Sequence, residues 1–183
     1  IAVARGDVIG FLHADDLFSD DAALSRVAAT MTDPSVAAVY GDLIYVSKGQ
    51  PDRVVRDWRA GEFSPAKLRR GWMPPHPTLY VRRSVFESVG RFDTTLRIAA
   101  DYDWMLRLLL AGHRLAYIPQ VQVRMRTGGA SNRSVGNIMR KSGEDFAALR
   151  RNGFSVAGAT TMRSAAWPTA TCRTSATPSY RSE

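Results

Sequence analysis

The chain of 183 residues lacks several features that define common classes of protein. Its only cysteine, Cys172, excludes a disulfide framework within the chain, and no cysteines and histidines have the spacing of a zinc site. No apolar run approaches the roughly 18 to 20 residues that span a bilayer, and no signal peptide is visible at the start. No glycine-rich phosphate loop of the Walker type is present. We therefore expect a cytoplasmic protein that is not a P-loop enzyme.

Acidic residues are scarce at the C-terminal end, and this imbalance accounts for most of the net charge of +8. Residues 124–183 hold ten Lys and Arg against three acids, a surplus of seven, whereas residues 1–123 hold fifteen against fourteen. A basic segment of this kind attracts nucleic acid or an anionic membrane surface. A binding module of that type is therefore an alternative function, and a solvated surface is the other interpretation. The Arg-rich stretch has no interleaved aromatic residues, which disfavours nucleic acid.

Short apolar runs alternate with amphipathic stretches, and this alternation predicts an α/β fold. Residues 8–12 (VIGFL) predict a strand that is buried on both faces and central in a parallel sheet. Further strands are expected at 36–46, with a bend near Gly41, and at 54–58, 78–81 and 115–125. Helices are expected at 20–31, 64–70, 84–90, 99–112 and 137–152.

Local signals set the boundaries of these elements. Ser19 is the expected N-cap of the first helix, with Asp20 and Asp21 in its first turn. Residues 74–77 (PPHP) exclude a helix and predict extended chain. Residues 1–153 are expected to form one domain, whereas residues 154–183, rich in Ser, Thr and Arg, are expected to be disordered.

An acidic pair, Asp15 and Asp16, follows the first predicted strand directly. Ligands of open α/β sheets bind beyond the carboxyl ends of strands. Two adjacent carboxylates repel each other unless a cation lies between them, and Mg²⁺ or Mn²⁺ prefers such oxygen ligands. The pair therefore predicts a metal site, and the alternative is that one of the two residues caps the next helix.

Further candidates lie at a helix start and in a rigid segment. Asp101 opens the helix at 99–112 and is a candidate general base, or alternatively a helix cap. His76 lies between prolines that hold the backbone, which suits a positioned donor or acceptor as well as a structural histidine. Arg126 precedes a Gly-rich stretch and Ser131, an arrangement that suits either a diphosphate clamp or a charged surface. Trp72 could stack on a sugar, with packing as the alternative.

Four stretches, in their order along the chain, are similar to motifs of family 2 glycosyltransferases with the GT-A fold. Residues 4–16 (ARGDVIGFLHADD) resemble the stretch that reads A-R-G-x-x-I-x-F-L-D-A-D-D in that family. Residues 75–78 (PHPT) and 82–93 (RRSVFESVGRFD) resemble the segment that follows it. Residues 100–108 (ADYDWMLRL) are similar to the E-D-x-D-x-x-x-R motif on the acceptor side, and residues 126–131 to the end of the domain. The resemblance covers residues 2 to about 152.

The resemblance implies an inverting transfer, in which an acceptor hydroxyl attacks the anomeric carbon of a nucleotide-diphosphate sugar. Asp15 and Asp16 fall on the motif that binds Mg²⁺ or Mn²⁺, and Asp101 falls on the catalytic base. The implied acceptor is a saccharide or lipid-linked saccharide of cell-envelope polysaccharide synthesis, which places the enzyme at the inner face of the cell membrane. The residues expected to bind the substrates or to support the catalytic site are His13, His76, Asp103, Arg107, Arg126 and Ser131.

The sequence departs from the family pattern at three positions and in its extent. His13 stands where the family usually has Asp, Ala100 where Glu is common, and Thr127 where His is common. The first βα units of the family, which carry much of the nucleotide pocket, have no counterpart here. We therefore expect a partial GT-A fold, a Rossmann-like mixed sheet flanked by helices without its N-terminal βα units, and little or no activity from this chain by itself. A phosphoryl-transfer hydrolase with paired carboxylates on a metal is a second alternative.

Overall fold

The computed structural model describes residues 1–154 except 69, 71, 97 and 128–143. The sequence-predicted tail lies outside the described residues, apart from residue 154 at its start. Ser131 and residues 137–143, the first half of the last predicted helix, lie outside them as well.

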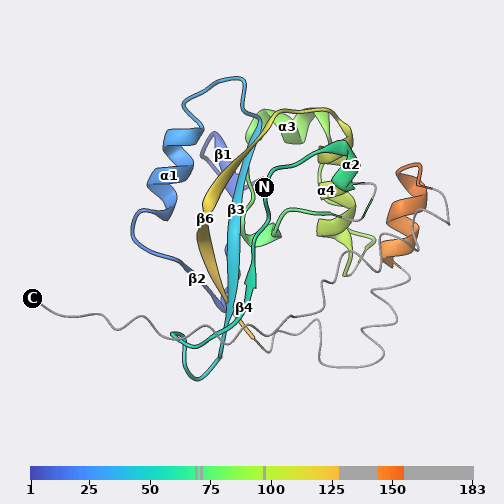
Figure 1. Cartoon of the computed structure of the whole chain (residues 1–183). Coiled ribbons are helices and arrows are strands. Elements are labelled where there is room, and N and C mark those ends of the chain that lie inside the picture. Colours follow the sequence, from blue (N-terminus) through green and yellow to red (C-terminus); the bar gives the residue numbers. More distant parts are fainter. Residues whose placement is uncertain (69, 71, 97, 128–143, 155–183) are drawn as a thin grey trace, which may run out of the picture.

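A mixed sheet of six strands forms the centre of the described chain (Figure 1). Five strands lie in the order β1, β5, β3, β6 and β2, and β4 pairs with β3 beside this path. Strands β3 and β6 run parallel, whereas the other pairings are antiparallel. The strands are β1 Val8–Gly10, β2 Asp16–Phe18, β3 Ala38–Val46, β4 Val54–Trp58, β5 Tyr80–Arg82 and β6 Leu115–Arg126.

The prediction of a central, doubly buried first strand is wrong. Strand β1 lies at one end of the strand order and, among the described residues, pairs only with β5, in the antiparallel direction. Within β1 only Ile9 is buried. The apolar run continues past the end of β1 into the following loop, where Phe11 lies. The ring of Phe11 stacks on the ring of His76, with 5.8 Å between ring centroids. The run therefore supplies an aromatic side chain to the predicted site.

The predicted bend near Gly41 coincides with a break in the pairing of β3 with β6. The register shifts on either side of Asp42, so that the partner of Gly41 is Ile118 and the partner of Asp42 is Val121. A Cβ atom on Gly41 would lie 2.5 Å from the side chain of Gln122, which is closer than real contacts allow. Glycine therefore lets the two long strands approach each other at this irregularity.

Helices lie on both sides of the sheet (Figure 1). Helix α1 packs Val27 and Met31 on a small cluster that contains Val36, Val39 and Ile118. Across the sheet lie α2, α3 and α4. The helices are α1 Ala23–Thr30, α2 Pro65–Leu68, α3 Arg83–Ser88, α4 Ala100–Leu110, the 3₁₀ turn η1 His76–Thr78, and a helix at residues 144–151.

The larger core is built around α4, where the sequence predicts an apolar stripe of Trp104, Leu108 and Ala111, of which Ala111 is exposed. Trp104 and Leu108 are buried, and Trp104 stacks on Phe86 of α3 with 4.6 Å between ring centroids. Leu149, from the helix at residues 144–151, is buried in the same core. Among the described residues, no helix has the length and apolar character needed to cross a membrane.

Two local predictions are wrong. Helix α1 begins later than expected, because the carboxylate of Asp20 accepts a hydrogen bond from the Ala22 amide at 2.9 Å and pairs with Arg26. This turn closes before the helix starts, so Ser19 is not its cap. The segment at residues 74–77 is extended at Pro75, as expected, but from His76 it forms η1, His76–Thr78, because proline fits the first turn of a helix, where its missing N–H is not needed.

Candidate functional site

Three of the predicted site residues come together from distant parts of the chain. His13 lies in the loop between β1 and β2, His76 opens η1, and Asp101 lies in the first turn of α4. The His76 Nδ1 atom lies 4.0 Å from Asp101 Oδ2, and the rings of His13 and His76 are 5.9 Å apart between centroids. The fold thus gathers two imidazoles and a carboxylate, groups that can bind hydroxyls and move protons.

The imidazole of His76 is held in an apolar setting. It stacks on Phe11, whose ring also meets Phe92 edge-on, and the His76 side chain is only 14% exposed. Burial lowers the pKa of His76, with His13 acting in the same direction and the Asp101 carboxylate opposing both. We infer that His76 is neutral at pH 7, so that its ring carries one hydrogen-bond donor and one acceptor.

Asp101 is a half-exposed carboxylate at the positive end of a helix. Its side chain is 45% exposed, Oδ1 accepts a hydrogen bond from the Tyr102 amide at 2.8 Å, and Oδ2 faces His76. The N-cap position of α4 is Ala99, which has no side-chain cap. The structure therefore does not make Asp101 the N-cap, and it leaves one carboxylate oxygen directed toward the histidine.

The acidic pair is divided between two environments. Asp15 is exposed, whereas Asp16 begins β2 and is only 6% exposed. The Asp16 Oδ2 atom has no hydrogen-bond partner among the described residues. Burial raises the pKa of Asp16 and the charge of Asp15 adds to this, while His13 and the amide and charge of Arg126 act against it. The two carboxylates thus meet different surroundings rather than one shared cavity.

The acidic pair fits a divalent cation only together with other oxygen ligands. Within the described ranges, no three His, Cys, Asp or Glu side chains are grouped so that they could hold a metal ion. Mg²⁺ is commonly bound by one or two carboxylates and completed by substrate phosphates. The exposed Asp15 and the unpartnered oxygen of Asp16 fit a site of that kind, in which a diphosphate supplies the remaining ligands.

Asp103 and Arg107 hold α4 to its surroundings. Their ion pair is 3.0 Å long, and Asn152 donates to the other oxygen of Asp103 at 3.1 Å. Arg107 also donates to the carbonyl oxygens of Val89 and Arg91, at 2.6 and 2.8 Å. Asp103, Arg107 and Asn152 line a pocket of about 320 Å³ on the side of α4. Because protein partners engage both side chains, their contacts support a structural part in the site rather than the predicted substrate contact.

The two arginines at the end of β6 differ in their partners. Arg124 pairs with Asp52 at 3.0 Å, which ties it to the turn between β3 and β4. Arg126 closes β6, and its backbone amide and its charge act to lower the pKa of Asp16. The predicted partner Ser131 lies outside the described residues, as do most of the basic residues of the C-terminal third. The alternative of a nucleic-acid or membrane-binding module therefore gains no support from these contacts.

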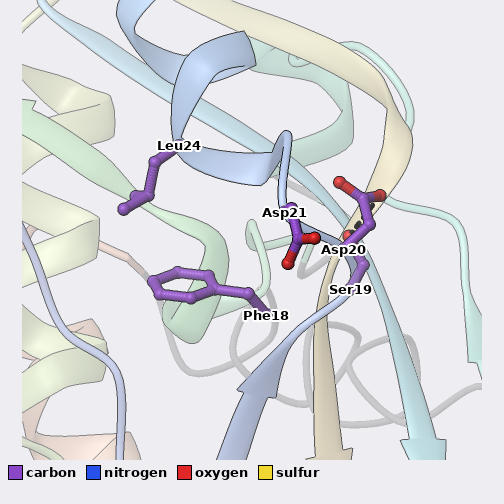
Figure 2. A pocket seen from close by; sticks show the side chains of 5 residues that line it. All are labelled: Phe18, Ser19, Asp20, Asp21 and Leu24. Atoms are coloured by element: carbon purple, nitrogen blue, oxygen red, sulfur yellow. Dashed lines mark hydrogen bonds between the residues drawn. The ribbon is translucent and has the colours of Figure 1, made fainter.

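A separate pocket of about 420 Å³ lies between β2 and α1 (Figure 2). Phe18 and Leu24 line one side of it, and acidic side chains line the other. Asp20 is engaged by Ala22 and Arg26, as described above. None of the predicted site residues lines this pocket.

Two acidic residues near the site are not among the residues predicted from the sequence. Asp42, buried in β3, accepts hydrogen bonds from Tyr117 at 2.6 Å and from Arg59 at 3.1 Å. Asp42 also accepts a hydrogen bond from the Ala60 amide, which fixes the chain after β4. The indole of Trp72 donates to the carbonyl of the same Ala60, so the packing interpretation of Trp72 is supported. Only an isolated aspartate within an apolar strand hinted at this role.

The second missed residue is Glu144. Its carboxylate accepts hydrogen bonds from the amides of Ile98 and Ala99, directly before α4. In the sequence, Glu144 is one acidic residue in a polar segment. Its hydrogen-bond partners lie more than forty residues earlier in the chain, so no local pattern indicates the contact.

The mixed sheet with helices on both sides has the GT-A fold, which is a fold of glycosyltransferases. A mannosyltransferase from Pyrobaculum calidifontis, solved with GDP-Man and Mn²⁺, shares the fold with a TM-score of 0.52 at 18% identity, covering 90% of this chain and 46% of that one. The model of glycosyl transferase family 2 matches residues 1–102, more than half of the chain, and the chain belongs to this family. The predicted GT-A fold and the predicted family are therefore confirmed.

The relatives in this family are named for O-antigen synthesis. The O-antigen chain rhamnosyltransferase WbaN of Salmonella anatum is 28% identical over 130 residues, which are 66% of this chain and 41% of that protein. The O-antigen biosynthesis protein RfbC of Myxococcus xanthus is 31% identical over 135 residues, 74% of this chain and 10% of that protein. The chain thus spans less than half the length of either relative.

Proposed function

We propose that the protein transfers a sugar, with inversion, from a nucleotide-diphosphate sugar to a hydroxyl of a saccharide acceptor. The observation that supports the proposal is the convergence of His13, His76 and Asp101, with the half-exposed carboxylate of Asp101 lying 4.0 Å from His76, in a chain of glycosyl transferase family 2. The names of the relatives favour an acceptor of cell-envelope polysaccharide synthesis, free or lipid-linked, and hence work at the inner face of the membrane.

Asp101 is the proposed base. Its Oδ2 takes the proton of the acceptor hydroxyl as the oxygen attacks the anomeric carbon, and the bond from that carbon to the diphosphate oxygen breaks on the opposite face. The position in the first turn of α4 favours the ionised carboxylate, and half-exposure leaves an oxygen free to reach the substrate. The neutral His76 beside it holds a substrate hydroxyl through either ring nitrogen.

Asp15 and Asp16 are the proposed metal residues. A bound Mg²⁺ or Mn²⁺ supplies positive charge to the departing diphosphate. Asp15 offers the exposed carboxylate, and Asp16 offers the oxygen that lacks a protein partner among the described residues. Arg126 and Ser131 are proposed to assist the diphosphate, and His13 to contact the donor between the metal residues and His76.

The test compares Asp101→Asn with a control, Asp21→Asn, which changes an exposed carboxylate before α1. Transfer from a panel of nucleotide-diphosphate sugars, including GDP-mannose and rhamnose donors, is measured with Mn²⁺, and donor binding is measured by calorimetry. We expect Asp101→Asn to lower transfer by roughly 10²–10⁴-fold while donor affinity stays nearly unchanged. Equal transfer by the two variants would show that Asp101 is not the base. Because little or no activity is expected from this chain by itself, both variants are made in a protein that also supplies the first βα units of the family, and the absence of both donor binding and transfer there would count against the proposed function as a whole.

A further inference from the structure

Helix α4 begins without a capping side chain from its own segment. Its N-cap is Ala99, followed by Ala100, and neither can accept a hydrogen bond through its side chain. The first amides of a helix have no partner within the helix and need acceptors from elsewhere. Here Glu144 Oε2 accepts from the amides of Ile98 and Ala99, at 2.8 and 3.0 Å. A carboxylate from a later helix thus holds the N-cap residue Ala99 and the residue before it, directly ahead of α4.

Glu144 is held in place by the helix that carries it. Ala148 and Leu149 of that helix are buried in the core around α4. At its far end, Asn152 donates to Asp103 of α4 at 3.1 Å. Glu144 and Asn152 therefore contact α4 and the residues before it at two separate points. Anchoring of this kind distinguishes Glu144 from a surface acid that meets a helix end by chance.

The contact acts on the residues that set the direction of Asp101. The Ala99 carbonyl accepts the Asp103 amide at 2.9 Å, so holding Ile98 and Ala99 fixes the first turn in which Asp101 lies. Asp101 Oδ2 lies 4.0 Å from His76 in that arrangement. Bonds from amides to a carboxylate are stronger than those to a neutral acceptor, and a negative charge suits the start of a helix.

We propose that Glu144 is a positioning residue, which fixes the first turn of α4 and so directs Asp101 toward His76. The proposal rests on the proposed function in so far as Asp101 is the base. It assigns a part in the site to a residue beyond the segment that matches the family model, which ends at residue 102. It also means that the helix at residues 144–151 belongs to the working site.

The first experiment needs no activity. Hydrogen exchange of the Ile98 and Ala99 amides is measured by NMR in the full chain and in Glu144→Ala, Glu144→Gln and Arg150→Ala. We expect exchange to accelerate by about 10-fold or more in Glu144→Ala, since a hydrogen bond to a charged group is lost, and by less in Glu144→Gln, which keeps an acceptor oxygen. Arg150→Ala, an exposed position on the same helix, should change neither amide. Unchanged exchange in Glu144→Ala would overturn the proposal.

A second readout separates positioning from stability. The Asp101 charge offsets part of the lowering of the His76 pKa by burial. If Asp101 is misdirected, this offset is lost, and NMR titration of the His76 ring should show a lower pKa. In transfer assays, kcat should fall by about tenfold in Glu144→Ala with little change in KM for the donor, and Glu144→Gln should recover part of the loss. Faster exchange with the His76 pKa and kcat both unchanged would overturn the positioning role. If no transfer is found even when the first βα units are supplied, the proposed function fails, whereas exchange and titration in the chain by itself still decide the placement of Asp101.

Discussion

The two sides of the candidate site are built differently. On the α4 side, two carboxylates near Asp101 have protein partners: Asp103 binds Arg107 and Asn152, and Glu144 accepts from the residues before the helix. On the side of the acidic turn, Asp15 is exposed and one oxygen of Asp16 is buried without a partner in the described part of the chain. On the α4 side the carboxylates are occupied by protein partners, which fix the geometry of the helix. In the acidic turn, carboxylate oxygens remain available to a ligand from outside the described chain.

The difference indicates where stability and function are each concentrated. A buried carboxylate oxygen without a partner costs free energy, and natural proteins retain such costs mainly at functional positions. A carboxylate with partners on both oxygens contributes to the fold instead, as Asp103 does. Substitutions on the α4 side should therefore lower stability, and substitutions in the acidic turn should leave stability equal or higher while removing donor binding.

The largest effect is expected for Arg107→Ala. The substitution leaves the nearly buried carboxylate of Asp103 without its ion-pair partner, and it removes the two bonds to the carbonyls of Val89 and Arg91. Removing one member of a buried pair typically costs about 3–5 kcal/mol. Denaturant unfolding measures this loss. The control is Arg91→Ala, an exposed side chain that lines the same pocket and should change stability little. A similar small change for both variants would show that the α4 side is not the stabilised one.

A smaller effect of opposite sign is expected for Asp16→Asn. The buried carboxylate loses its charge while keeping its shape, so the free energy of unfolding at pH 7 should rise, on the order of 1 kcal/mol. Mn²⁺-dependent binding of a nucleotide diphosphate should weaken in the same variant. Thermal unfolding and calorimetry measure the two effects together. A loss of stability in Asp16→Asn would mean that the acidic turn is built like the α4 side, and the contrast between the two regions would be gone.

The sequence predicts the parts of this molecule that follow from local pattern. The apolar stripe of α4, the bend near Gly41 and the order of family motifs could all be read from neighbouring residues. Long-range contacts could not: the Glu144 bonds to Ile98 and Ala99 span more than forty residues, and nothing near Glu144 indicates them. The edge position of β1 was missed for a related reason, since an apolar run does not reveal whether its side chains face a second strand or a neighbouring loop, as Phe11 does.

The smallest effect is a dependence of stability on pH that comes from His76, which lies between the two regions. Burial lowers its pKa from the usual value of 6.5, so the folded state binds this proton less tightly than the unfolded chain. The contribution of His76 to stability is therefore complete above pH 6.5 and is lost as the pH falls below that value toward the folded-state pKa. The slope cannot exceed about 1.4 kcal/mol per pH unit for one proton, and the Asp101 charge keeps it smaller by favouring the protonated ring.

Two variants separate the contributions of His76 and Asp101 to that slope. Thermal unfolding between pH 7.5 and pH 5, roughly the range over which a histidine titrates, should show a flatter profile in His76→Gln and a steeper one in Asp101→Asn. The second result follows because Asp101→Asn removes the charge that offsets the burial of His76. If the Asp101→Asn profile matched that of the unaltered chain, the 4.0 Å contact would carry no electrostatic coupling, and the two sides of the site would be independent rather than joined through His76.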